Sequence, residues 1–332
     1  MKVVFGTQTF GVEGKEGVRT NDPEECRAIL QLLKKRRYGE LDSSRVYGDG
    51  TAEEMLGALQ WRDLGFTIGT KLYPTKSTGL SMFSYQYTHE PEDVRRATMD
   101  SLKALKADKV GLLYLHGPDR TVPFEETLEE INELYKEGCF NRFGLSNFMS
   151  WEVAQICEIC KMNGWIAPTV YQGIYNVVHR AIEQELIPCL RHYGISLYGF
   201  QPLAGGFLTD RYERGMKEDD YEPGSRFDPK TLQGMVIQGV YMNDSYLVAL
   251  ELIREAAKEH GLTEAECALR WIVHHSALSD KHGDAIVMGA SSIRQLKSNL
   301  DDLGKGPLPE TMLQVLDTAW TKTNSVASKY FH

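Results

Sequence analysis

Short apolar segments alternate with amphipathic segments of helical periodicity along almost the whole chain, and this alternation constrains the fold more than any other feature. Strands are expected at residues 3–6, 39–44, 66–72, 110–116, 140–146, 169–176, 195–200 and 285–290. Helical patterns lie between them, including 91–106, 124–137, 150–163, 181–193, 244–260, 263–275 and 292–301. Strands that alternate with helices indicate βαβ units and a parallel sheet. Eight such units predict the α/β class, as a closed (β/α)8 TIM barrel.

An open doubly wound sheet is the rival architecture. It needs a glycine fingerprint after an early strand, but the first strand leads into GTQTFG, which does not have the G-x-G-x-x-G spacing, so the barrel is favoured. Residues 73–90 and 205–243 are too long for simple connections and are predicted to form substrate loops at the carboxyl face of the barrel. With 332 residues and no linker composition, residues 1–332 are expected to form one barrel domain.

Two helix starts can be recognised in the sequence. Asp22 precedes Pro23, which is the usual order of an N-cap and a first helical residue. Thr51 and Glu54 have the spacing of a capping box.

Charge and composition exclude several classes of partner. The formal net charge of −9 argues against nucleic acid, because phosphate binding requires a basic face. The sequence has neither a signal-peptide core nor an apolar run of membrane-spanning length, so the protein is expected to be cytoplasmic and not membrane-bound. Cys157 and Cys160 lie inside a helical pattern without a second pair at zinc spacing, which favours structural cysteines.

Polar and titratable side chains occur where the predicted strands end. Active sites of such barrels lie at the carboxyl ends of the strands. The residues at these ends are Asp42, Lys71, His116, Ser146, Asn147, Gln172, Phe200 and the segment 289–292, and Tyr47 follows just beyond the second strand. Each has an ordinary structural explanation by itself, since a loop tyrosine usually packs and a lysine after a strand is usually solvated. Their combination predicts a site.

The second and third strands suggest the chemistry. A lysine buried at position 71 requires a carboxylate partner, and Asp42 on the adjacent strand can supply it. We expect Lys71 to lower the pKa of Tyr47 from its usual value of about 10, which makes the phenol a usable general acid. His116 is expected to donate a hydrogen bond to the substrate oxygen that Tyr47 protonates. None of these four residues has a partner at metal-ligand spacing, such as H-x-H or H-E-x-x-H, so no metal site is predicted.

Seven ordered motifs connect these residues to a known family. LDSSRVYG, TKL, LLYLHGPD, GLSNF, YQGIYN, PLAGGFLT and GASSIRQLKSNL resemble the aldo-keto reductase superfamily, and within it the aflatoxin-aldehyde reductase branch, from Gly6 to about Asn299. The resemblance implies reduction of small-molecule aldehydes, and of ketones as a further class, to alcohols. NADPH would supply the hydride and Tyr47 the proton.

The resemblance also implies roles for individual residues. The catalytic tetrad would be Asp42, Tyr47, Lys71 and His116. The implied cofactor-binding set is Thr7, Asp42, Ser146, Asn147, Gln172, Phe200, Gln201, Pro202, Leu203, Gly205, Gly289, Ser291, Gln295 and Asn299. Phe200 takes the place of the tyrosine that usually stacks on the nicotinamide. Relatives often have a lysine near Gly289 for the 2′-phosphate. Here that lysine is missing, and Arg226 is the candidate replacement, with a solvated loop residue as the alternative.

The substrate-facing segments depart from the branch. The loop QGVYMNDSY and the tail ASKYFH are more aromatic and less basic than the same segments of the branch, which tend to carry extra arginines. This difference favours neutral or aromatic aldehydes as substrates. Two other functions stay open, namely a cofactor-binding regulatory subunit of the channel-β type with little turnover, and a reductase of sugars or aryl alcohols. A homodimer is the habit of the branch, although the sequence contains no interface signature.

Overall fold

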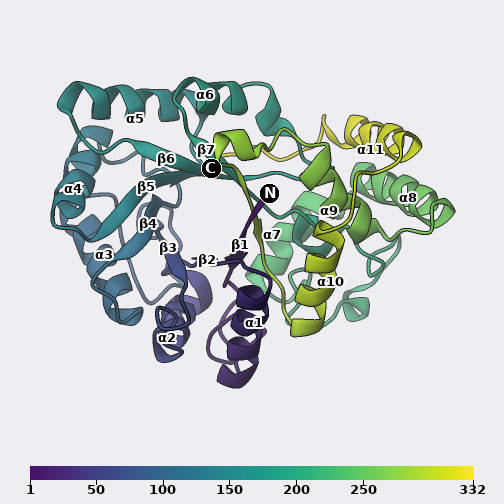
Figure 1. The fold of residues 1–332 in the computed structure, drawn as a ribbon, viewed down its shortest axis with the longest axis horizontal. Helices are drawn as coiled ribbons and strands as arrows, with labels where there is room; N and C mark the ends of the chain where they lie inside the picture. The colour runs from purple at the N-terminus through teal and green to yellow at the C-terminus, as the bar shows by residue number, and fades with distance from the viewer.

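Eight parallel strands close into a barrel in the computed structural model, which describes residues 1–332 (Figure 1). Each strand pairs with the next, and β1 pairs with β8 to close the barrel. The strands are β1 (Lys2–Gly6), β2 (Glu40–Asp42), β3 (Thr67–Leu72), β4 (Val110–Leu115), β5 (Phe140–Ser146), β6 (Pro168–Ile174), β7 (Ser196–Phe200) and β8 (Ala285–Met288). The predicted (β/α)8 barrel is therefore confirmed, and the doubly wound sheet is excluded.

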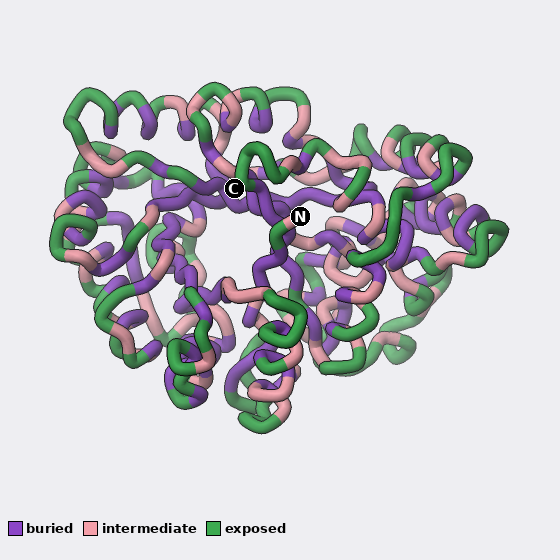
Figure 2. The backbone as a smooth tube through the Cα atoms, viewed as in Figure 1, coloured by how far each residue is buried: buried purple, intermediate pink, exposed green.

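The helices surround the barrel (Figure 1). They are α1 (Pro23–Lys35), α2 (Thr51–Ala58), α3 (Pro91–Ala104), α4 (Phe124–Lys136), α5 (Ser150–Asn163), α6 (Leu186–His192), α7 (Leu232–Tyr241), α8 (Asp244–Glu259), α9 (Glu264–His274), α10 (Ile293–Leu303) and α11 (Glu310–Thr323). Figure 2 shows buried positions along the central strands and exposed positions on the outer sides of the helices. None of the helices combines the length and the apolar composition that crossing a bilayer requires.

A small cluster of side chains fills the inside of the barrel. Its members are Val4, Leu112, Tyr114, Val170, Tyr198, Ala285 and Val287. At the amino-terminal end of the strands, Lys2 Nζ donates to the Tyr198 hydroxyl at 2.6 Å and pairs with Glu40 at 2.5 Å. Because the interior is packed in this way, the barrel is not a pore. A large cavity begins at the carboxyl ends of the strands.

The two predicted helix starts have different outcomes. The Asp22 side chain accepts from the Glu24 amide at 3.0 Å, which confirms the N-cap of α1. The capping box at Thr51 is wrong, because Gly50, with φ +92°, is the N-cap of α2. The Thr51 hydroxyl instead donates to the Gly48 carbonyl at 2.7 Å, and Glu54 faces Arg45 at 3.4 Å.

The predicted helix at 181–193 is interrupted. A single 3-10 turn, η2 (Ala181–Glu183), precedes α6, which begins only at Leu186. Pro188 explains the break. It has no amide hydrogen to donate, and its ring would clash with the carbonyl of residue 184 in a continuous helix. In α6 the proline lies in the first turn, where a helix tolerates it.

Two helices were not predicted. α7 lies inside the segment 205–243, which was predicted to be a loop, and α11 follows the last predicted helix. The α7 sequence LQGMVIQGVY contains two glycines and three β-branched residues, which lower intrinsic helix propensity. The helix nevertheless forms, with the Thr231 side chain accepting from the Gly234 amide at 3.0 Å. α11 packs against α8 on the outside of the barrel.

Candidate active site

A buried ion pair joins the ends of two neighbouring strands. Asp42 ends β2, Lys71 lies near the end of β3, and each is at most 2% exposed. Lys71 Nζ lies 2.6 Å from Asp42 Oδ2 and also donates to the Ser43 carbonyl at 2.7 Å. The Gln172 side chain donates to the other Asp42 oxygen at 2.8 Å. Burial opposes the charge of Lys71, but Asp42 and Tyr47 together raise the pKa of its ammonium, so Lys71 is charged. Burial raises the pKa of the Asp42 carboxyl, and the charge of Lys71 and the Gln172 hydrogen bond oppose that rise.

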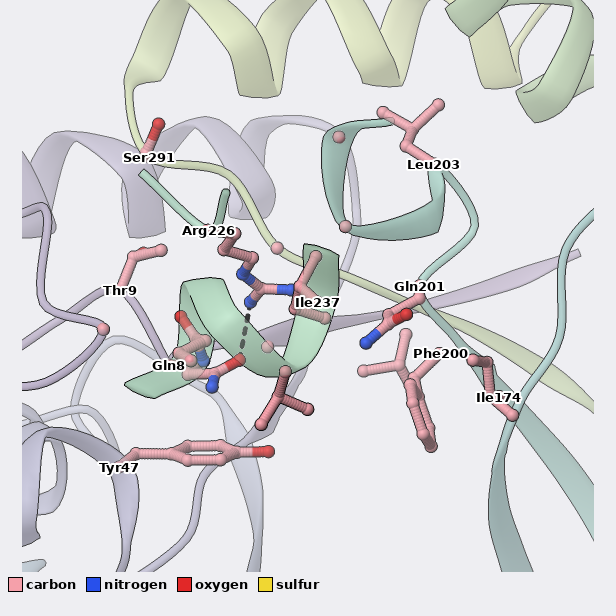
Figure 3. Close-up of a pocket in the computed structure, with 18 of the residues that line it drawn as sticks. Gln8, Thr9, Tyr47, Ile174, Phe200, Gln201, Leu203, Arg226, Ile237 and Ser291 are labelled. Carbon is pink, nitrogen blue, oxygen red and sulfur yellow. Dashed lines mark hydrogen bonds between the residues drawn. The ribbon is translucent and has the colours of Figure 1, made fainter. Parts of the chain in front are cut away.

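Tyr47 connects this pair to open space. It begins the short 3-10 turn η1 (Tyr47–Gly50), and its ring lies along the floor of a cavity with the hydroxyl directed inward (Figure 3). Lys71 Nζ donates to the hydroxyl at 3.1 Å. The predicted lowering of the Tyr47 pKa is wrong, because burial raises the pKa and Asp42 works against the effect of Lys71. At neutral pH the phenol is therefore protonated.

His116 approaches Tyr47 from β4. The two rings meet edge to face with centroids 6.0 Å apart, and His116 Nδ1 lies 3.2 Å from the Ser44 hydroxyl. Burial and the nearby Lys71 hold the pKa of His116 well below its ordinary value. The imidazole is therefore neutral at neutral pH, so it can position a polar ligand without adding charge to the site.

A cavity of about 680 Å³ lies beyond the strand ends and contains most of the predicted site residues. The predicted residues that line it are Asp42, Tyr47, His116, Asn147, Gln172, Phe200, Gln201, Pro202, Leu203, Gly205, Arg226, Gly289, Ser291, Gln295 and Asn299. Lys71 lies beneath Tyr47. Two predicted cofactor contacts, Thr7 and Ser146, do not line the cavity. Thr7 donates to the Asp42 carbonyl at 3.0 Å, and Ser146 accepts from the Asn147 side chain at 3.1 Å. Both therefore hold in place a residue that lines the cavity.

Two side-chain amides lie near the Tyr47 end of the cavity. Asn147, at φ +64°, donates its Nδ2 to the His116 carbonyl at 2.7 Å. Gln172 likewise donates its Nε2 to Asp42 Oδ1. The side chains of both residues line the cavity, and an amide oxygen is an acceptor that suits a ligand with N–H donors. The ring of Phe200, at the end of β7, lies on the side of the cavity opposite Tyr47 (Figure 3).

Arg226 projects into the cavity and is not a solvated loop residue. Its Nη2 donates to the neutral Gln8 side chain at 2.6 Å, and it forms no salt bridge (Figure 3). The same nitrogen lies 3.9 Å from the place where a Cβ on Gly289 would stand. The guanidinium thus lies next to the space above Gly289 that a longer side chain could occupy. A half-buried arginine without a carboxylate partner is suited to bind an anion.

Several wall residues were missed by the sequence analysis. They are Gln8 and Thr9 after β1, Tyr73, Leu80 and Phe83 in the segment 73–90, and Leu232, Val236 and Ile237 on α7. One signal was available, because Leu232, Val236 and Val240 recur every four residues, as on one face of a helix. The tail ASKYFH, which was expected to face the substrate, contributes Tyr330 and His332 to the wall. Its last amide donates to the Asn147 carbonyl at 3.2 Å.

Comparisons with known proteins agree on one family. Residues 2–321 match the model of the aldo/keto reductase family. The chain is 46% identical over 331 residues to the aldo-keto reductase pigE of Monascus ruber, covering 99% of this chain and 97% of the relative. It is 37% identical to aflatoxin B1 aldehyde reductase member 2 of Mus musculus, covering 99% and 87% of the two chains. It is 38% identical to human aldo-keto reductase family 7 member A3, with 94% of each chain covered.

Proposed function

This chain belongs to the aldo/keto reductase family of oxidoreductases that act on carbonyl compounds, and from that premise we propose that it reduces aldehydes to alcohols with NADPH. The observation that carries the proposal is the position of the Tyr47 hydroxyl, which lies at the cavity floor and accepts from Lys71 of the buried Lys71–Asp42 pair. Bound NADPH would supply a hydride to the carbonyl carbon.

Tyr47 would supply the proton to the carbonyl oxygen. Because Lys71 donates to the phenol oxygen, the Tyr47 hydrogen is free to point into the cavity. When that proton leaves, the Lys71 ammonium stabilises the phenolate that forms. The neutral His116 would orient the same carbonyl oxygen, so the four predicted catalytic residues act as one unit.

The pH dependence of reduction follows from the direction of the Tyr47 pKa. The acid form is the active form, so activity is present below the pKa and is lost as the pH rises through it. Because burial raises the pKa of Tyr47, kcat/KM should be flat through neutral pH and decline only above the ordinary phenol value of about 10. A pH profile of kcat/KM checks this, and a Tyr47-dependent decline centred near pH 7 would contradict it.

The cavity wall fits the parts of a dinucleotide. Asn147 and Gln172 would accept from the carboxamide, and the Phe200 ring would stack on the nicotinamide, since stacking requires the face and not a hydroxyl. Gln201, Pro202, Leu203 and Gly205 would follow the pyrophosphate. At the other end, Ser291 donates to the Gln295 side chain through both its amide, at 3.1 Å, and its hydroxyl, at 2.8 Å. This uncharged polar corner, with Asn299, would hold the adenosine.

Arg226 is the residue that we propose selects NADPH over NADH, through the 2′-phosphate. Arg226→Gln should raise the KM for NADPH about tenfold or more, because a hydrogen bond to a charged group is typically worth about 1.5–3 kcal/mol. The KM for NADH should change much less. Initial rates with each cofactor test this, with Arg226→Lys as the charge-retaining control. An equal increase of the KM for NADPH and for NADH would instead indicate that Arg226 binds the pyrophosphate.

Neutral or aromatic aldehydes remain the proposed substrates. The predicted loop and tail segments contribute Val240, Tyr241, Tyr330 and His332 to the cavity wall, and Lys329 is the one basic residue among their wall contacts. Residues 8–19, 289–299 and 328–332 all contribute to the same cavity, which supports treating residues 1–332 as one functional unit. Homodimerisation stays a prediction.

A further inference from the structure

Helix α7 carries an apolar ridge that solvent reaches. The ridge consists of Leu232, Met235 and Val236, which are 40%, 55% and 59% exposed. The helix contains no charged residue from Leu232 to Tyr241. Surface helices usually present a polar or charged face to water, and a group of exposed apolar side chains often marks a binding surface.

The apolar ridge is continuous with the cavity that contains Tyr47. Leu232 and Val236 line that cavity together with Ile237 and Val240, which lie deeper on the same helix. Figure 3 shows Ile237 within this wall. The segment 73–90 contributes Leu80 and Phe83 to the same cavity, beside the exposed Met82. The cavity that contains Tyr47 therefore presents apolar side chains from two segments, 73–90 and α7.

Charged partners for a substrate are scarce around this cavity. Arg19 and Arg211 share the carboxylate of Glu222, at 2.5 and 3.2 Å. Lys71 is paired with Asp42. Of the remaining cations on the wall, Arg226 faces Gln8 and Gly289, and Lys329 lies 5.5 Å above the Phe331 ring. The apolar ridge itself is uncharged, so it would leave a carboxylate resting on it without a partner.

We infer that the substrate is an aldehyde with an extended, uncharged apolar arm that lies along the apolar ridge of α7 while its carbonyl reaches Tyr47. This inference rests on the proposed aldehyde reduction and deepens it, by naming the part of the substrate that does not react. When the arm covers Leu232, Met235 and Val236, apolar surface of the arm and of the ridge is removed from water. This burial is the source of the selectivity for long apolar aldehydes.

The test is a series of straight-chain aldehydes, namely butanal, hexanal and octanal, followed through oxidation of NADPH. Full burial of a methylene is worth roughly fourfold, so an arm covered on one side should raise kcat/KM about twofold per methylene. An eight-carbon aldehyde with a carboxylate at its far end should lose this gain. Val236→Gln and Leu232→Gln should each lower kcat/KM for octanal several-fold more than for butanal.

Met162→Gln is the matched control. Met162 is 83% exposed near the end of α5, outside the cavity wall. Its replacement should leave kcat/KM for butanal, hexanal and octanal unchanged. Turnover that is independent of chain length, or an unchanged length dependence in both α7 variants, would overturn the inference and leave the proposed function standing. Failure to oxidise NADPH with any of these aldehydes would overturn both.

Discussion

Tyr47→Phe is expected to lower kcat for aldehyde reduction by about two to four orders of magnitude, which is the usual contribution of a positioned general acid. Phenylalanine keeps the ring on the cavity floor and removes only the hydroxyl that Lys71 contacts at 3.1 Å. Proton transfer to the carbonyl oxygen then has to come from water. Steady-state rates with a reactive aromatic aldehyde measure the loss.

Two controls make this result specific. The affinity for NADPH, measured by titrating protein fluorescence, should be nearly unchanged, since the proposed cofactor contacts are made by other residues. Tyr73→Phe removes another phenol of the same cavity, whose ring centroid lies 5.5 Å from that of His116, and should cost far less activity. If the wild-type protein binds NADPH but reduces no aldehyde of a broad panel, a regulatory cofactor-binding protein becomes the better description.

Lys71→Met is expected to lower the free energy of unfolding by about 3–5 kcal/mol, because removing one partner of a buried ion pair leaves the other charge uncompensated. Asp42 would stay 2% exposed, with the Gln172 amide at 2.8 Å as its remaining side-chain donor. The variant should also lose activity, since the ammonium that donates to the Tyr47 oxygen, and that would stabilise the phenolate, is removed. Urea unfolding followed by circular dichroism measures the stability.

A double variant shows whether the loss of stability comes from the unpaired charge or from lost packing. Asp42→Asn combined with Lys71→Met removes both charges and should recover much of the lost stability while staying inactive. Lys2→Met breaks the Lys2–Glu40 pair at the opposite end of the barrel and should cost less than about 1 kcal/mol, because Lys2 is 39% exposed. A double variant as unstable as Lys71→Met alone would show that lost packing, and not an unpaired charge, causes the destabilisation.

The barrel and the meeting of Asp42, Lys71, Tyr47 and His116 could be predicted from the sequence. Most strands contain an apolar segment of their own, and parallel strands of one barrel bring their carboxyl ends to one face. The errors occurred where local signals were weak or misleading. α7 has a poor intrinsic helix propensity, Thr51 follows a left-handed glycine, and Pro188 interrupts a segment with helical periodicity.

The amino-acid sequence alone sets the order of strands and helices, because apolar periodicity reflects which face of each segment is buried. It also determined which polar residues stand at the strand ends. Three features depend on how the chain packs in space: the raised pKa of Tyr47, the position of Arg226 beside Gly289, and the place of α7 in the cavity wall. The physical reason is that a pKa, an unpaired charge and an exposed apolar face depend on desolvation and on distances between residues far apart in the chain. Local periodicity contains no information about either quantity.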